Sequence, residues 1–130
     1  MRAAELYDYA IVRVVPRVER EEFINAGVIL SCQRTDFLRA AIDLHEARLL
    51  ALDPQADVDM VRRHLGAIVA ICEGAPGGGP IARLPLRARF HWLTARRSSI
   101  IQTSPVHTGL CTDAGAALDR VMARMVRRPA

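Results

Sequence analysis

Apolar and polar residues alternate with a period of two in three segments near the start of the chain, residues 7–15, 23–32 and 37–44. This period is typical of β-strands, in which successive side chains point to opposite faces. In the first segment the odd-numbered residues from Tyr7 to Val15 share one face, which places Arg13 among apolar and aromatic neighbours. Gly27 in the second segment indicates a bulge or the close approach of another backbone. The linkers are too short for a helical crossover, so the pattern predicts an antiparallel meander.

A helical period of 3.6 residues follows the meander. It predicts a short helix at residues 46–52 and a longer one at residues 58–72, with Asp57 as N-cap and Gly74 as C-cap. The apolar stripe of the longer helix consists of Val58, Val61, Leu65, Ile68 and Cys72. A last helix is expected to follow a cap at Thr112 or Asp113 and to run to Val126. Its apolar face consists of Leu118, Val121, Met122 and Met125.

The segment between the two main helices has a mixed pattern. Residues 74–85 are rich in Gly and Pro and predict an exposed connecting loop. Residues 89–94 and 98–103 alternate like two short strands around a turn at 95–97, and residues 106–110 extend the second strand past Pro105. On this interpretation Trp92 shares a core-facing side with Phe90, and His91 points the other way with Arg89.

These elements predict a single α+β domain over residues 1–130, because 130 residues are enough for one core of ordinary size. The expected order is βββαββα, with a mostly antiparallel sheet of about five strands and two main helices.

Charge is distributed unevenly along the chain. All 18 basic residues are arginine. Residues 1–73 hold nine Arg and twelve acids, whereas residues 74–112 hold five Arg and no acid. The second segment cannot neutralise itself locally, so its arginines must contact water, acids from elsewhere in the chain, or an anionic ligand.

Three cysteines, Cys32, Cys72 and Cys111, lack the spacing of a zinc site and are expected to be buried free thiols. No window approaches the length of an apolar membrane span, and the first residues lack the apolar run of a signal peptide. We therefore expect a cytoplasmic protein that does not contact a membrane. No cofactor and no metal are expected.

Residues 87–111 are the best candidate for chemistry, because they carry four Arg, two His, the only Trp and several hydroxyl groups without any acid. No complete catalytic set is present. The histidine tripeptides are His91-Trp92-Leu93 and His107-Thr108-Gly109, so the paired His-x-Thr/Ser pattern of a two-histidine phosphoesterase is missing. A GxSxG nucleophile motif is also missing.

Arginine and histidine donors suit an anion, since guanidinium groups bind phosphate or carboxylate through two hydrogen bonds. We expect one positively charged concave surface that consists of Arg13, Arg89, His91, Arg96, Arg97, Gln102 and His107. The alternative is internal pairing, with Arg13 bonded to Glu5 or Asp8 and the other arginines in solvent or paired with acids of the first 73 residues.

Three segments, RVVPRVEREEFINAGVIL, LDPQADVDMVRRHL and RFHWLTARRSSIIQTSPVHTGLC, resemble the bacterial family catalogued as domain of unknown function 3037. The resemblance spans nearly the whole chain. It implies a small stand-alone cytoplasmic protein and assigns no activity. It also implies a HipA-like kinase protein as partner, because relatives are often encoded beside such proteins.

The sequence therefore favours a non-catalytic binding or regulatory module with a protein partner. The alternative is an enzyme or binder that acts on a phosphorylated or nucleotide ligand through the Arg/His surface. Nucleic-acid binding ranks third, because neither a helix-turn-helix signal nor stacking aromatic residues accompany the positive charge.

Overall fold

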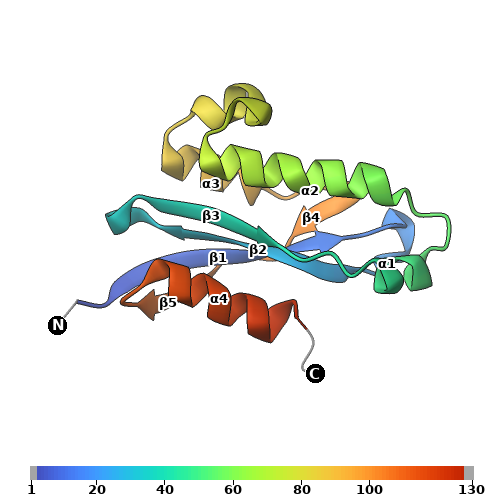
Figure 1. Ribbon diagram of the computed structural model, residues 1–130, viewed down its shortest axis with the longest axis horizontal. Coiled ribbons are helices and arrows are strands. Elements are labelled where there is room, and N and C mark those ends of the chain that lie inside the picture. The colour runs from blue at the N-terminus through green and yellow to red at the C-terminus, as the bar shows by residue number, and fades with distance from the viewer. Residues whose placement is uncertain (1–2, 128–130) are drawn as a thin grey trace.

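A five-stranded antiparallel sheet lies between two layers of helices in the computed structural model, which describes residues 3–127 (Figure 1). The strands are β1 (Glu5–Val14), β2 (Ile24–Cys32), β3 (Phe37–Ile42), β4 (Ile101–Thr103) and β5 (His107–Cys111). β1 to β3 form the predicted meander, with β2 in the centre. The outer side of β1 is shared, because β5 pairs with its first half and β4 with its last three residues.

The helices are α1 (Glu46–Leu52), α2 (Val58–Glu73), α3 (Leu86–Leu93) and α4 (Ala114–Met125). Three 3-10 segments accompany them, η1 (Val18–Arg20), η2 (Gln33–Thr35) and η3 (Pro76–Arg83). α2 and α3 cover one face of the sheet, η3 packs against α2 on the side away from the sheet, and α4 covers the other face (Figure 1). The α+β class, the antiparallel sheet of five strands and the two main helices are confirmed.

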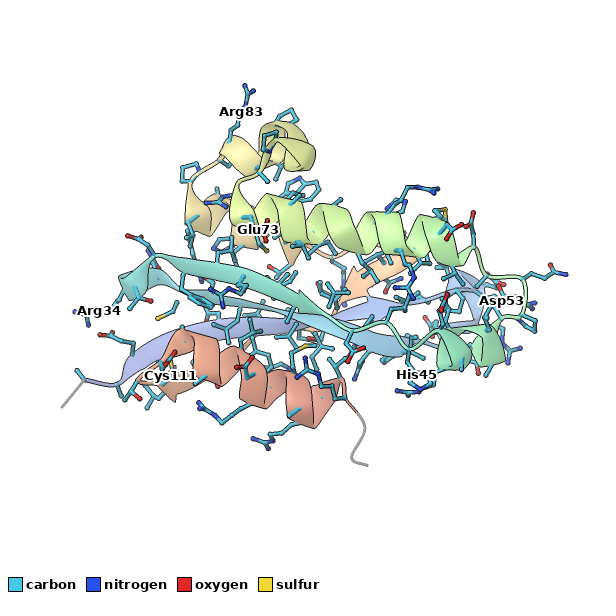
Figure 2. The ribbon with its side chains drawn as sticks, viewed as in Figure 1. Arg34, His45, Asp53, Glu73, Arg83 and Cys111 are labelled. Carbon is cyan, nitrogen blue, oxygen red and sulfur yellow. The ribbon has the colours of Figure 1, made fainter. Side chains whose placement is uncertain are left out.

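Each face of the sheet has its own apolar cluster. The stripe predicted for α2 packs with Val12, Val14, Ile29 and Phe90 in the first cluster. The face predicted for α4 packs with Val28, Leu30 and Cys111 in the second. Side chains on both faces are drawn in Figure 2, where Cys111 lies next to α4. Burial of these apolar side chains is the main stabilising contribution to folding.

The caps predicted from the sequence are also confirmed. Asp57 Oδ1 accepts a hydrogen bond from Met60 N at 3.0 Å, and Asp113 Oδ1 accepts one from Ala116 N at 3.1 Å. Gly74 ends α2 with a φ of 68°, a conformation that glycine adopts without steric cost.

Both expectations for Gly27 hold. The register between β1 and β2 shifts between Val12 and Arg13, so that Ala26 is an additional residue on β2. A Cβ atom at Gly27 would lie 2.5 Å from the carbonyl oxygen of Ala41 on β3. The bulge also changes which face each residue of β2 occupies, since Ala26 packs in the first cluster and Val28 in the second.

The predicted strand at residues 89–94 is wrong, because residues 89–93 belong to helix α3 and Thr94 is its C-cap. Its leading residues Leu86 to Arg89 are good helix formers, and Pro85 suits the position before the first turn. Phe90 and Leu93 are three residues apart and share the buried face of the helix. Trp92 therefore points outward and is 42% exposed, against the expectation that it lies in the core beside Phe90.

The predicted exposed loop at residues 74–85 is also wrong in part, because η3 occupies most of it. Gly79 breaks η3 with a φ of 67°. A Cβ atom at Gly78 would lie 3.0 Å from the backbone of Ile71, so the absence of a side chain lets the segment pack against α2. Arg83 projects away from the rest of the molecule at the end of η3 (Figure 2).

Cys32, Cys72 and Cys111 are buried free thiols, as predicted. Burial raises the pKa of Cys72 to about 12, and the guanidinium of Arg89 offsets this only in part. Such a thiol stays protonated near neutral pH and is a poor nucleophile.

No individual helix in residues 3–127 has the length and apolar character needed to cross a membrane. α2 and η3 together meet that condition by length and composition alone, but the two are bent by 52° relative to each other.

Candidate anion-binding groove

Arg13 is the next-to-last residue of β1 and directly follows the point where the bulge of β2 shifts the register. Asn25 of β2 and Gln102 of β4 are its neighbours across the sheet. The amide of Asn25 donates to the carbonyl oxygen of Met125 at 2.9 Å and so ties the end of α4 to this region. The local backbone therefore places an arginine where β1, β2 and β4 meet beside the end of a helix.

The Arg13 side chain has no acidic partner within the described part of the chain. Its guanidinium stacks on the ring of Phe23, with its central carbon 4.3 Å from the ring centre. Its Nε is buried and has no hydrogen-bond partner, and Oδ1 of Asn25 is likewise buried and unpaired. A buried N–H donor without an acceptor costs free energy, so internal hydrogen bonds do not account for this position of Arg13.

The alternative of an internal ion pair for Arg13 is wrong. Glu5 pairs with Arg34 at 3.4 Å, and Asp8 pairs with Arg87 of α3 at 2.6 Å. Both acids that the sequence offered to Arg13 are therefore bonded elsewhere.

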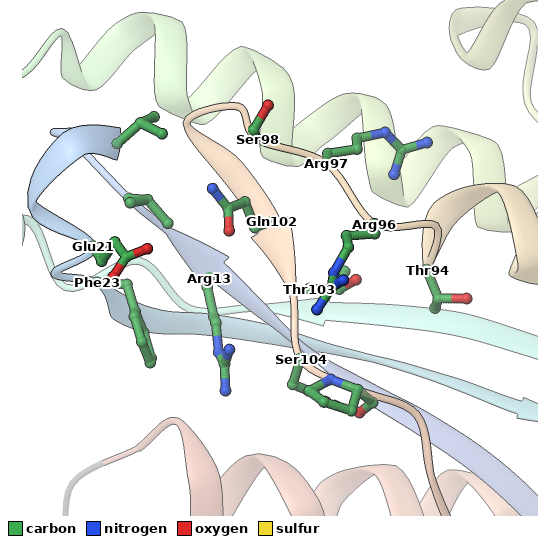
Figure 3. A pocket seen from close by; sticks show the side chains of 13 residues that line it. Arg13, Glu21, Phe23, Thr94, Arg96, Arg97, Ser98, Gln102, Thr103 and Ser104 are labelled. Atoms are coloured by element: carbon green, nitrogen blue, oxygen red, sulfur yellow. The ribbon is translucent and has the colours of Figure 1, made fainter.

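Arg13 lines a groove of about 950 Å³, called the Arg13 groove below (Figure 3). Thirteen described residues line it, and they come from β1, η1, β4 and the segments that connect β1 to β2, α3 to β4 and β4 to β5. Its charged residues are Arg13, Glu21, Arg96 and Arg97, and its apolar ones are Val15, Val18, Phe23 and Pro105. Its other polar residues are Thr94, Ser98, Gln102, Thr103 and Ser104. Three arginines against one acid make the groove positive.

Arg96 and Arg97 are neighbours in sequence but differ in their contacts. Arg97 donates to the carbonyl oxygens of Trp92 and Leu93 at the end of α3 and stacks on the Trp92 ring at 4.4 Å. Arg96 is exposed and forms no hydrogen bond or ion pair to any described residue. Figure 3 shows Arg13 and Arg96 on the two sides of β4. Arg97 thus fixes the connection that carries Arg96.

Arg89 lies outside the groove, and its position corrects its expected placement on a strand. It projects from α3 toward the end of α2, where its Nη1 donates to the carbonyl oxygens of Ile71 and Cys72 at 3.0 and 2.8 Å. Its Nε donates to the carbonyl oxygen of Leu84 at 2.9 Å. Arg89 therefore caps the C-terminus of α2, where a positive charge is favourable.

The two histidines of the predicted surface are not part of the groove either. His91 is exposed on α3, and His107 is exposed on β5 with its ring centre 5.3 Å from that of Tyr9. The structure thus brings together Arg13, Arg96, Arg97 and Gln102 and leaves Arg89, His91 and His107 elsewhere.

Phe23 and Glu21 line the groove but were not predicted. Phe23 begins the second predicted strand, and nothing in its own neighbourhood links it to Arg13, which is ten residues away. Only the pairing of β1 with β2 brings the two together. No group of three or more His, Cys, Asp or Glu that could hold a metal ion is found among residues 3–127.

The family described as "Protein of unknown function (DUF3037)" matches residues 9–126, so the chain belongs to this family. The match covers nearly all of the sheet and all four α-helices. Neither a curated protein nor a solved structure matches the chain.

Proposed function

We propose that this DUF3037 protein is a non-catalytic binding module that recognises an anionic group in the Arg13 groove. The observation that carries the proposal is Arg13 itself. Its guanidinium is held against Phe23, its Nε is buried without a partner, and no described acid pairs with it. A phosphate or carboxylate oxygen in the groove would bind the terminal nitrogens Nη1 and Nη2 of Arg13, which, unlike Nε, are not among the buried atoms.

Arg96 supports the same proposal, because it is an unpaired positive charge on the other wall of the groove. Two guanidinium groups around one space suit a group with several oxygen acceptors. Hydroxyl and amide groups of Ser98, Gln102 and Thr103 add neutral polar partners nearby.

Binding is favoured over catalysis by the composition of the groove. Neither His91 nor His107 lines it, and Glu21 is the single carboxylate that the described residues contribute to it. The hydroxyl of Ser104 accepts a hydrogen bond from Ile11 N and donates to the carbonyl oxygen of Pro105, so it is occupied by structural bonds. A nucleophile with an adjacent base is therefore not assembled by these residues.

We also propose that the module acts in the cytoplasm with a protein partner. The partner implied by the family resemblance is a HipA-like kinase protein. An anionic side chain on that partner is the group that the groove would bind. The second candidate, a phosphorylated small molecule or nucleotide, has the same chemistry at the arginines and differs only in its source.

Titration with inorganic phosphate, followed by two-dimensional ¹H–¹⁵N NMR, tests the groove directly. Amide signals of Gln102 and Thr103 should shift, and Arg13→Gln should raise the Kd at least about tenfold, the loss expected for one charge-assisted hydrogen bond. Arg120→Gln removes the same charge from α4, outside the groove, and should leave the Kd unchanged. Equal binding by wild type and Arg13→Gln would refute the proposal.

Co-expression with a HipA-like kinase tests the partner. Wild type and Arg120→Gln should co-purify with the kinase, and Arg13→Gln should lose it. If all three co-purify equally, the kinase does not bind through this groove. Bound nucleotide or phosphorylated metabolite in the wild-type preparation, identified by mass spectrometry, would instead support the second candidate.

A further inference from the structure

β4 forms an edge of the sheet, because β1 is the only strand that pairs with it among residues 3–127. Val15 N donates to the carbonyl oxygen of Ile100, and Ser104 N donates to that of Ile11. Alternate residues of β4 therefore form backbone hydrogen bonds to β1. The other residues, Ile101 and Thr103, direct their N–H and C=O groups to the outer side of the strand. The carbonyl oxygen of Ile101 accepts from the Ser99 hydroxyl at 2.8 Å. The backbone of Thr103 remains available to another strand.

The α3–β4 connection runs past this edge without closing it. Its hydrogen bonds return to α3, since Thr94 donates to the carbonyl oxygen of Phe90 and Arg97 to those of Trp92 and Leu93. No hydrogen bond from residues 94–98 reaches β4 in the part of the chain that the structure describes. The space between the connection and β4 belongs to the Arg13 groove.

A second hollow, of about 170 Å³ and called the Trp92 hollow below, lies between α2, α3 and β4. It is mainly apolar and includes Ala67, Ile68, Trp92 and Ile101. Gln102 and Thr103 line both this hollow and the Arg13 groove. The same two residues of the edge strand thus have a positive groove on one side and an apolar hollow on the other.

Consecutive side chains of an extended chain point to opposite faces. A segment that pairs with the outer side of β4 would therefore place one side chain toward Arg13 and Arg96 and the next toward Trp92. We infer that β4 binds an extended acidic peptide as an additional strand, with an acidic side chain in the Arg13 groove and an adjacent large apolar side chain in the Trp92 hollow. This is the known mode of strand addition, in which backbone hydrogen bonds give affinity and side-chain hollows give specificity.

The charges of the site select this occupant. The groove has three arginines and one acid, so a peptide with an acidic residue complements it and a basic one is repelled. The exposed Trp92 offers a partner for a large apolar side chain beside it. The inference rests on the proposed function, since it names the kind of partner that the anion-binding groove receives.

The test uses the full chain and a displayed library of random heptapeptides, selected on the wild type. Selected peptides should share an acidic residue next to a large apolar one. A synthetic peptide from the selection should bind Arg13→Gln at least tenfold more weakly. Ala67→Phe, which fills the Trp92 hollow from the exposed side of α2, should weaken binding similarly. Arg120→Gln and Ala123→Phe on α4 are the matched controls and should bind like wild type.

Backbone pairing is tested with the same peptide after N-methylation of each amide in turn. Methylation of the amides that face β4 should weaken binding at least tenfold, and the Thr103 amide proton of the protein should exchange more slowly in the complex. Peptides that tolerate every N-methylation, or a library that yields no binder, would overturn strand addition.

Titration with inorganic phosphate separates this inference from the proposed function. If phosphate binds in an Arg13-dependent manner and no peptide does, the groove holds anions and strand addition is wrong. If neither phosphate nor any peptide binds, both proposals fail. A phosphorylated peptide that binds where its acidic counterpart does not would assign the groove to phosphate and overturn the acidic-peptide assignment.

Discussion

At the scale of single residues, arginines of this protein have two distinct uses. Arg89 and Arg97 donate to backbone carbonyl oxygens at the ends of α2 and α3. Arg13 and Arg96 have no comparable acceptor among residues 3–127. Helix C-termini carry unpaired carbonyl groups and a partial negative charge, so an arginine there needs no acid. Arginine is therefore structural at positions 89 and 97 and available for a ligand at positions 13 and 96.

Arg89→Ala should therefore destabilise the fold rather than alter anion binding. It removes three charged hydrogen bonds, which predicts a loss of about 2 kcal/mol in the free energy of unfolding. Urea denaturation followed by circular dichroism measures it. Arg83→Ala, at the exposed end of η3, is the control and should change stability by less than about 0.5 kcal/mol. Equal stability of the two variants would contradict the capping role.

The buried thiol of Cys72 should make the free energy of unfolding depend on pH in the alkaline range. Burial raises its pKa to about 12, whereas a cysteine in the unfolded chain titrates near about 8.5. Between these values the unfolded chain has released the proton and the folded chain still holds it, so stability falls as pH rises. The slope from this residue should approach about 1.4 kcal/mol per pH unit. Denaturation of wild type and Cys72→Ala from pH 8 to pH 10 tests this, and parallel profiles would contradict it.

At the scale of elements, the parts that the sequence predicted well are those with one clear period and a cap. The alternation of β1 and the 3.6-residue stripes of α2 and α4 are long enough to exclude the other period. Residues 89–94 are too few for that, because Phe90, Trp92 and Leu93 fit a strand or a helix equally well. Tertiary contacts decide such a case, here the bonds of Arg89 to α2 and of Arg87 to β1.

The candidate site was predictable to the same extent. Arg13, Arg96, Arg97 and Gln102 could be grouped from the excess of arginine over acid in residues 74–112 and the unusual arginine on the first strand. The sequence wrongly assigned Arg89 to the anion-binding surface, because a comparison of arginines with acids considers only acids as internal partners. Backbone carbonyl groups at a helix end are equally good acceptors and leave no mark in the sequence.

The close approach of β2 and β3 at Gly27 leaves no room for a side chain. A Cβ atom there would meet the backbone oxygen of Ala41 at 2.5 Å, and backbone cannot move aside cheaply. Gly27→Ala should cost about 1–3 kcal/mol of stability through steric overlap. Gly66→Ala in α2 is the matched control, since no atom from outside the adjacent backbone of α2 lies within 4 Å of its added Cβ. That variant should gain about 0.5–1 kcal/mol from helix propensity. Thermal denaturation should show a lower melting temperature for Gly27→Ala and a higher one for Gly66→Ala. Equal changes in the two variants would refute the steric argument.

At the scale of the whole molecule, one sheet separates the two apolar clusters and contributes to both. Ile29 of β2 packs on the side of α2, whereas its neighbours Val28 and Leu30 pack on the side of α4. Loss of packing on one face should therefore disturb the central strand and, with it, the other face. Such coupling is the physical basis of cooperative unfolding in small domains.

This coupling is testable with Trp92, which lies on the α2 side of the sheet beside the second hollow. Leu118→Ala removes a buried side chain from the α4 side and should cost about 2–5 kcal/mol. If the sheet unites both faces, Trp92 fluorescence and far-ultraviolet circular dichroism should report the same lowered midpoint in urea. Leu65→Ala, in the cluster on the α2 side, should act alike on both signals. The two faces would unfold separately if Leu118→Ala left the urea midpoint of Trp92 fluorescence unchanged while circular dichroism showed two transitions. The Arg13 groove would then depend on both faces, because Asn25 beside Arg13 is bonded to Met125 of α4, whereas Gln102 and Thr103 of the same groove also line the hollow beside α2 and α3.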